Sequence, residues 1–152
     1  MNQELKELER RIENREVSIS EAHEINKKFH RIYYSKWNPR DSGQKERTEN
    51  WTISKNLFLK LANKIWSEFK EKYPSKTSYA YSPRENVNSG GCSHIVMKEE
   101  ASFGRRKREA HDPLCKKRKH FWMLSDVSDS EPTCIVCLRV AEDILKKSTL
   151  TK

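Results

Sequence analysis

The chain carries, close to its C-terminal end, the sequence Pro132-Thr133-Cys134-Ile135-Val136-Cys137-Leu138-Arg139. Two residues separate the cysteines, a spacing that lets both thiolates face one tetrahedral metal ion from a tight turn. A redox dithiol is the alternative interpretation, but it requires a thioredoxin-like strand before the pair and leaves the nearby Cys115 unexplained. The pattern therefore favours zinc, with the pair as one half of its site.

The other half of the site is expected upstream of this pair. All four cysteines fall between Cys92 and Cys137, and in a reducing compartment such thiols more often bind metal than form disulfides. Cys115 is the third candidate ligand. Cys92 and His94 would point to the same side of a strand, so either could ligate. The residues alone leave the fourth ligand open among Cys92, His94, His111 and His120.

A longer pattern around the pair resembles a group of small bacterial and phage zinc-finger proteins. It consists of His94-Ile95-Val96, Leu114-Cys115, the aromatic Trp122 and Thr133-Cys134-Ile135-Val136-Cys137-Leu138-Arg139. In that group the pattern runs histidine-hydrophobic, Leu-Cys-Gly, then Thr-Cys-x-x-Cys-Leu-Arg; here Lys116 replaces the glycine. The likeness covers roughly residues 90 to 147. It implies one structural zinc ion bound by His94, Cys115, Cys134 and Cys137.

The first half of the chain is expected to be helical. Apolar residues recur at spacings of three and four around Leu5 and Leu8, and Ser18 with Glu21 matches the capping box that begins a helix. Residues 38–50 lack apolar side chains and are predicted to be a loop. A third helix is predicted from about Thr52 to Lys72, because apolar residues in this range keep a helical period. It is expected to end there, because proline at position 74 disfavours helix in the residue before it.

The predicted organisation is a helical region, 1–74, a linker, 75–89, and a zinc-binding module, 90–152. The linker is rich in turn-forming residues, although Tyr79 and Tyr81 could form a short strand within it. Apolar residues at helical spacing after Cys137 predict a C-terminal helix, and Phe121 to Leu124 predict a strand. The expected fold is α+β and mostly α: a helical hairpin or three-helix part followed by a small zinc-finger module.

Composition narrows the class of protein. Hydrophobic residues make up 34% and charged residues 35% of the chain, which supplies one modest core but hardly two self-sufficient ones. We see neither a long apolar run nor an N-terminal signal peptide, so a cytoplasmic protein without a membrane anchor is expected. In a eukaryotic host, the basic clusters would also suit nuclear import.

A basic segment surrounds Cys115. The chain has a net charge of +9, and eight cations gather in this one segment: Arg105, Arg106, Lys107, Arg108, Lys116, Lys117, Arg118 and Lys119. Such a cluster beside a rigid zinc site is a plausible phosphate-binding surface, although a merely solvated loop has the same composition. Two partners are therefore predicted as alternatives: nucleic acid, or a host protein gripped by a phage-type adaptor or inhibitor.

The sequence predicts a binding protein rather than an enzyme. Zinc deaminases also have a Cys-x-x-Cys pair after a proline, but they need a His-x-Glu element. None of the five histidines has a glutamate two residues later. A catalytic zinc also needs an open coordination position, whereas four candidate ligands are available here.

Overall fold

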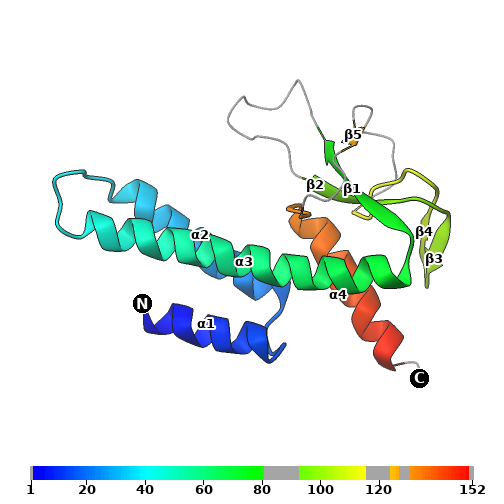
Figure 1. The fold of residues 1–152 in the computed structure, drawn as a ribbon, viewed down its shortest axis with the longest axis horizontal. Coiled ribbons are helices and arrows are strands. Elements are labelled where there is room, and N and C mark those ends of the chain that lie inside the picture. Colours follow the sequence, from blue (N-terminus) through cyan, green and yellow to red (C-terminus); the bar gives the residue numbers. More distant parts are fainter. Residues whose placement is uncertain (1, 81–92, 116–123, 127–130, 151–152) are drawn as a thin grey trace. The chain divides into compact units, whose positions relative to one another are not determined.

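The computed structural model describes residues 2–80, 93–115, 124–126 and 131–150, and it contains two compact units (Figure 1). The first unit is Met1–Leu61 and the second is Ala62–Lys152. The division falls inside the long helix α3, Gln44–Lys72. The predicted fold class is confirmed: N-terminal helices are followed by short antiparallel strands and a final helix. Among the described residues, no helix is long and apolar enough to cross a membrane.

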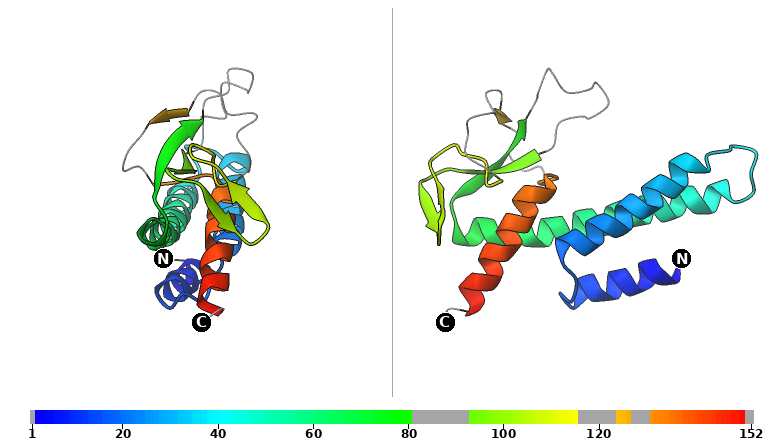
Figure 2. Two further views of the ribbon diagram at one scale, coloured as in Figure 1. Left: turned by 90° about the vertical axis from the view of Figure 1, so that its right-hand side faces the viewer. Right: turned by 180° about the vertical axis from the view of Figure 1, so that it is seen from behind.

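The first unit consists of helix α1, Gln3–Glu13, helix α2, Ile19–Ser35, and the first part of α3. Helix α2 and this part of α3 run antiparallel, as the views from both sides show (Figure 1, Figure 2), and the rings of Tyr33 and Trp51 stack between them with centroids 4.5 Å apart. Lys28 pairs with Glu4 at 2.7 Å and ties α1 to α2. The core is built from one apolar stripe on each helix: Leu5, Leu8, Ile12, Ile19, Ala22, Phe29, Leu57, Phe58 and Leu61.

Both short helices begin at residues whose side chains cap them. The Asn2 side chain accepts the Glu4 amide at 2.8 Å, and Ser18 Oγ accepts the Glu21 amide at 3.2 Å. These bonds satisfy amides that the first helical turn leaves without a backbone partner. The predicted start of the second helix at Ser18 is therefore confirmed.

The loop predicted for residues 38–50 is shorter in the structure, because α3 already begins at Gln44. Asp41 organises this start: its carboxylate accepts the Gly43 amide at 3.0 Å and the Arg47 guanidinium at 2.8 Å. Arg47 also donates to the Lys36 carbonyl at the end of α2. The first turns of α3 are polar and are held by these side-chain hydrogen bonds. Hydrophobic periodicity cannot detect a helical segment that has almost no apolar residues.

In the second unit, a three-stranded antiparallel sheet has the order β2-β1-β5. Its strands are β1, Ser75–Ala80, β2, Ser93–Met97, and β5, Leu124–Asp126. Helix α4, Ile135–Leu150, confirms the predicted C-terminal helix and contacts β2. All residues of β2 are buried, although β2 is an outer strand in the order β2-β1-β5.

Strand β1 occupies the first part of the segment predicted as a linker. Residues 75–79 pair with β2, and Ser78 to Ala80 pair with β5. Thr77 and Ser78 are each about 1% exposed, so the polar composition that suggests a connector here belongs to a buried strand. Residues 81–89, the rest of the predicted linker, lie outside the described residues, as do Phe121 and Trp122.

A two-stranded hairpin follows β2. Strands β3, Ala101–Phe103, and β4, Arg106–Arg108, pair antiparallel and are joined by Gly104 and Arg105. Gly104 has φ of +63°, the value that glycine allows at the first central position of a tight hairpin turn. The hairpin thus carries the first half of the basic segment.

Replacing Leu8 by alanine tests the packing of the first unit. Leu8 is 1% exposed, so the truncation should lower the free energy of unfolding by about 2 to 5 kcal/mol. Urea denaturation followed by far-ultraviolet circular dichroism measures this loss. Lys55→Ala is the control, because Lys55 is exposed on α3 and should change stability by less than about 0.5 kcal/mol. Equal effects of the two variants would contradict the packing of α1.

Candidate metal centre

His94 is the second residue of the buried strand β2. It pairs with Ser78 of β1 in the sheet register and is 4% exposed. The strand fixes the backbone on both sides of the imidazole, because Ser93 and Ile95 are also held by hydrogen bonds to other segments. The ring is therefore presented from a rigid element.

Cys115 is positioned by residues 112–114, which lie along the edge of β2 that does not pair with β1. The Leu114 amide donates to the Ile95 carbonyl at 2.7 Å, and the Met97 amide donates to the Asp112 carbonyl at 3.0 Å. Val96 and Pro113 form a bridge between these two bonds. Cys115 follows directly, and its Sγ lies 3.4 Å from His94 Nδ1.

Cys134 and Cys137 lie at the start of α4. The amides of Thr133 and Cys134 both donate to the Ser93 carbonyl, at 2.9 and 3.0 Å, and Thr133 Oγ1 accepts the Ser93 amide at 2.9 Å. These three bonds fasten the start of the helix to the residue before His94. The Cys137 amide points at Cys134 Sγ, 3.5 Å away, so the backbone of the turn stabilises negative charge on that sulfur.

The four side chains converge on one point. Their ligand atoms, one nitrogen and three sulfurs, all lie within 4.8 Å of one another. His94 Nδ1 is 3.4 Å from Cys115 Sγ and 3.5 Å from Cys137 Sγ. In a tetrahedral zinc site, Zn–S of about 2.3 Å and Zn–N of about 2.0 Å place sulfur and nitrogen about 3.5 Å apart. The cluster therefore has the size and donor chemistry of a zinc site.

The electrostatics of the cluster favour a cation at its centre. Hydrogen bonds from Cys134 and Cys137 lower the pKa of the Cys115 thiol well below its ordinary value. Burial, reinforced by the two neighbouring thiols, raises the pKa of the Cys137 thiol. One thiolate is thus stabilised by its neighbours, while a second buried thiolate is opposed. A dication removes this opposition, because it neutralises several thiolates at once.

Arg108 supports the metal centre from behind. Its guanidinium is buried and donates to the Leu114 carbonyl through Nε at 3.2 Å and through Nη2 at 3.1 Å. Leu114 precedes Cys115, so this fork fixes the peptide that carries the third thiol. Arg108 is one of the residues predicted to bind nucleic acid. In the structure its guanidinium is buried and donates to the carbonyls of Leu114 and Lys107, so it is not exposed as Arg105 and Lys107 are. Successive side chains of a strand point to opposite faces, so Arg108 and Lys107 of β4 face opposite ways. This alternation was the sequence signal that could have distinguished the buried arginine from its exposed neighbour.

The other residues of the basic segment have different surroundings. Arg105 and Lys107 are exposed, and Arg106 pairs with Asp143 of α4 at 3.0 Å. Lys116, Lys117, Arg118 and Lys119 lie outside the described residues.

Of the alternative ligands, only His111 is described by the structure. It is exposed in a turn with φ of 74° and is not part of the cluster. Cys92 and His120 lie outside the described residues.

Comparison with known proteins places the metal centre inside a recognised family region. A family model described as a domain of unknown function, DUF8336, matches residues 86–145. This span contains all four residues of the cluster. No curated protein and no solved structure matches the chain.

Removing one ligand tests the metal centre. Cys137→Ser should abolish stoichiometric zinc binding and unfold the second unit, because structural zinc contributes about 10 to 16 kcal/mol of apparent binding energy. Metal analysis and fluorescence of the buried Trp66 measure both effects. His111→Asn is the matched control, because asparagine tolerates a positive φ. Zinc retained at wild-type content in Cys137→Ser would contradict the assigned ligand set.

Replacing Arg108 tests whether its guanidinium holds the peptide that positions the Cys115 thiol. Arg108→Ala should weaken zinc binding by about 10- to 100-fold, the usual effect of losing a group that orients a ligand. Competition with a chromophoric chelator measures the affinity. Lys107→Ala removes a neighbouring exposed charge and should leave zinc affinity unchanged. A similar affinity for both variants would show that Arg108 does not hold the Cys115 peptide.

Proposed function

We propose that this protein is a small binding protein whose second unit is stabilised by one structural zinc ion. The observation that carries this proposal is the convergence of His94, Cys115, Cys134 and Cys137 within 4.8 Å. Four protein ligands complete a tetrahedral shell, whereas catalytic zinc keeps one position for water or substrate. The zinc therefore acts on folding, and the protein is not an enzyme.

The proposed ligand is nucleic acid, bound through phosphates by the basic segment, residues 105–119. The described part of this segment is tied to the metal centre at two places: Arg108 bonds the Leu114 carbonyl, and Cys115 is itself one of the four candidate ligands. Arg105 is exposed in the turn before β4, and Lys107 is exposed within β4. Zinc would thus hold the hairpin that carries these two cations, which lowers the entropy lost when phosphates bind.

The salt dependence of binding tests this function. With Arg108 buried, about four to six of the remaining cations should meet phosphates, giving a log–log salt slope of roughly −3 to −5. Fluorescence anisotropy with generic duplex and single-stranded DNA or RNA measures the slope. Replacing Lys116, Lys117, Arg118 and Lys119 together by glutamine should flatten it by about 2 to 4 and weaken binding to all sequences alike.

A charge-matched variant is the control for this experiment. Four exposed cations of the first unit, replaced together by glutamine, change the net charge by the same amount: Arg31, Lys36, Lys45 and Lys55. This control should bind nearly as well as the wild type. Equal losses of affinity in the two quadruple variants would show that net charge alone, and not the basic segment, accounts for binding. A wild-type protein that binds no nucleic acid at about 50 mM salt would refute the function.

The second candidate function is that of an adaptor or inhibitor that binds a protein, and one observation favours it. Tyr34 and Trp37, near the end of α2, are 62% and 54% exposed. Tyr33 contacts both of them, with ring centroids 5.2 and 5.4 Å away. Tyrosine and tryptophan are the residues that most often dominate protein interfaces. If this is the function, Trp37→Ala should abolish binding of the partner and leave zinc content unchanged.

A further inference from the structure

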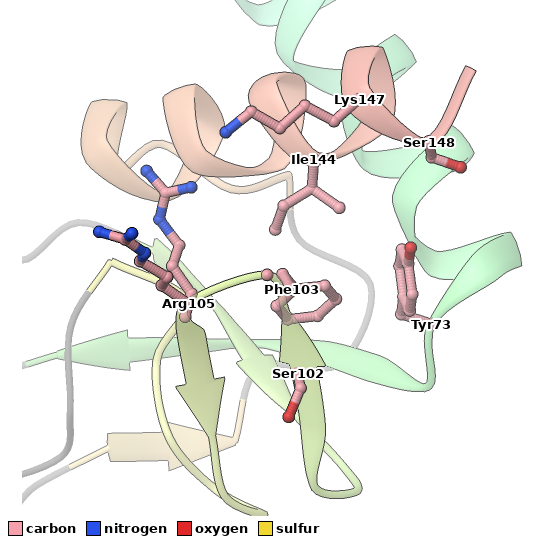
Figure 3. A pocket seen from close by; sticks show the side chains of 9 residues that line it. Tyr73, Ser102, Phe103, Arg105, Ile144, Lys147 and Ser148 are labelled. Carbon is pink, nitrogen blue, oxygen red and sulfur yellow. The ribbon is translucent and has the colours of Figure 1, made fainter. Parts of the chain in front are cut away.

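The second unit has a cleft between the β3–β4 hairpin and α4, with Tyr73 at one end (Figure 3). Its volume is about 900 Å³, within the range of about 300 to 1,000 Å³ that is typical of ligand pockets. None of the four metal-binding candidates lines it. The cleft is thus a separate feature of the zinc-stabilised unit.

One part of the cleft is apolar and aromatic. The Phe103 and Tyr73 rings meet edge to face, with centroids 4.9 Å apart and planes at 88°. Ile144 of α4 points toward Phe103 across the space (Figure 3). Because the two rings are perpendicular, they form a corner and do not cover each other as a parallel stack would. Both side chains remain partly exposed, so this corner is accessible to a flat apolar group.

The opposite part of the cleft is positively charged. Arg105, Arg106 and Lys147 line it. Arg106 and Lys147 share one acid, Asp143, whose Oδ2 lies 3.0 and 3.2 Å from their nitrogens. Arg105 is exposed and makes no ion pair with any other described residue. Among the described residues that line the cleft there are thus three cations and no acid, and Asp143 beside it pairs with only two of them, so the surplus charge attracts an anion.

We propose that this cleft binds one unstacked nucleotide of a single-stranded nucleic acid, with the base against Phe103 and Tyr73 and a phosphate on Arg105. The proposal rests on the proposed nucleic-acid binding and specifies its form. A base offers a flat face for aromatic stacking beside an anionic phosphate, and in a duplex the neighbouring bases cover that face. Arg105 and Arg106 belong to both the basic segment and the cleft. A strand whose phosphates bind at Arg105 and Arg106 is therefore already at the cleft.

The experiment compares three ligands of equal length: a single-stranded thymidine 12-mer, the same strand with abasic sites, and a 12-base-pair duplex. Phe103→Leu keeps an apolar side chain and removes the aromatic face. It should weaken binding of the thymidine strand by about 5- to 150-fold, the usual worth of one base–aromatic stack. Binding of the abasic strand and the duplex should change by less than about twofold. Tyr73→Leu should show the same selectivity, and Phe103→Tyr, which keeps the aromatic face, is the matched control.

The outcomes separate this proposal from the function on which it rests. If the wild type binds thymidine and abasic strands equally and Phe103→Leu changes neither, the cleft proposal fails while phosphate binding stands. If the wild type binds none of the three, both fail. Thymidine monophosphate binding as tightly as the 12-mer would assign the cleft to a free nucleotide. Tighter, Phe103-dependent binding of a glutamate–tyrosine copolymer would assign it to an acidic peptide. Either result overturns the proposal.

Discussion

The second unit depends on one constraint: three segments that are distant in sequence must bring one imidazole and three thiols to a single point. Strand β2 supplies His94, the segment beside its free edge supplies Cys115, and the start of α4 supplies the cysteine pair. Each segment is fastened to β2 by backbone hydrogen bonds. The bonds align the ligands, but they do not remove the cost of gathering thiolates in a buried place, where like charges oppose ionisation. A dication bound at this point would offset that cost and would couple metal binding to folding.

The three arginines of the β3–β4 hairpin have different surroundings and therefore different roles. Arg108 faces inward and holds the Leu114 carbonyl, Arg106 bridges to Asp143 of α4, and Arg105 remains exposed. A guanidinium suits the buried role because two of its N–H groups can donate to one carbonyl oxygen, as those of Arg108 do to Leu114. The exposed charges are consequently anchored to the metal centre through their buried neighbour. If zinc binds Cys115 as proposed, its loss should disturb the β3–β4 hairpin as well as the core, because Arg108 links the two.

The two units are stabilised in different ways. The first buries a continuous apolar stripe from three helices and adds ion pairs such as Lys28 with Glu4. The second also buries apolar side chains, among them Phe69, Ile95 and Leu138, and it contains the polar strand β1, whose Thr77 and Ser78 are buried. Among the described residues, the side chains placed to hold a metal ion lie in this second unit.

Local sequence determined the helices, the cap at Ser18 and the metal chemistry of the cysteine pair, because periodicity, capping and a two-residue spacing act over a few residues. The full ligand set followed from a longer resemblance and not from spacing. Only the tertiary structure decided that β1 occupies the first part of the expected linker, that α3 begins at Gln44, and that Arg108 is buried. Each of these depends on partners distant in the chain: β2 and β5 for β1, the Lys36 carbonyl for Arg47 in the first turns of α3, and the Leu114 carbonyl for Arg108. Composition cannot report such partners, because a polar side chain is equally suited to water and to a buried hydrogen bond until the fold supplies the acceptor.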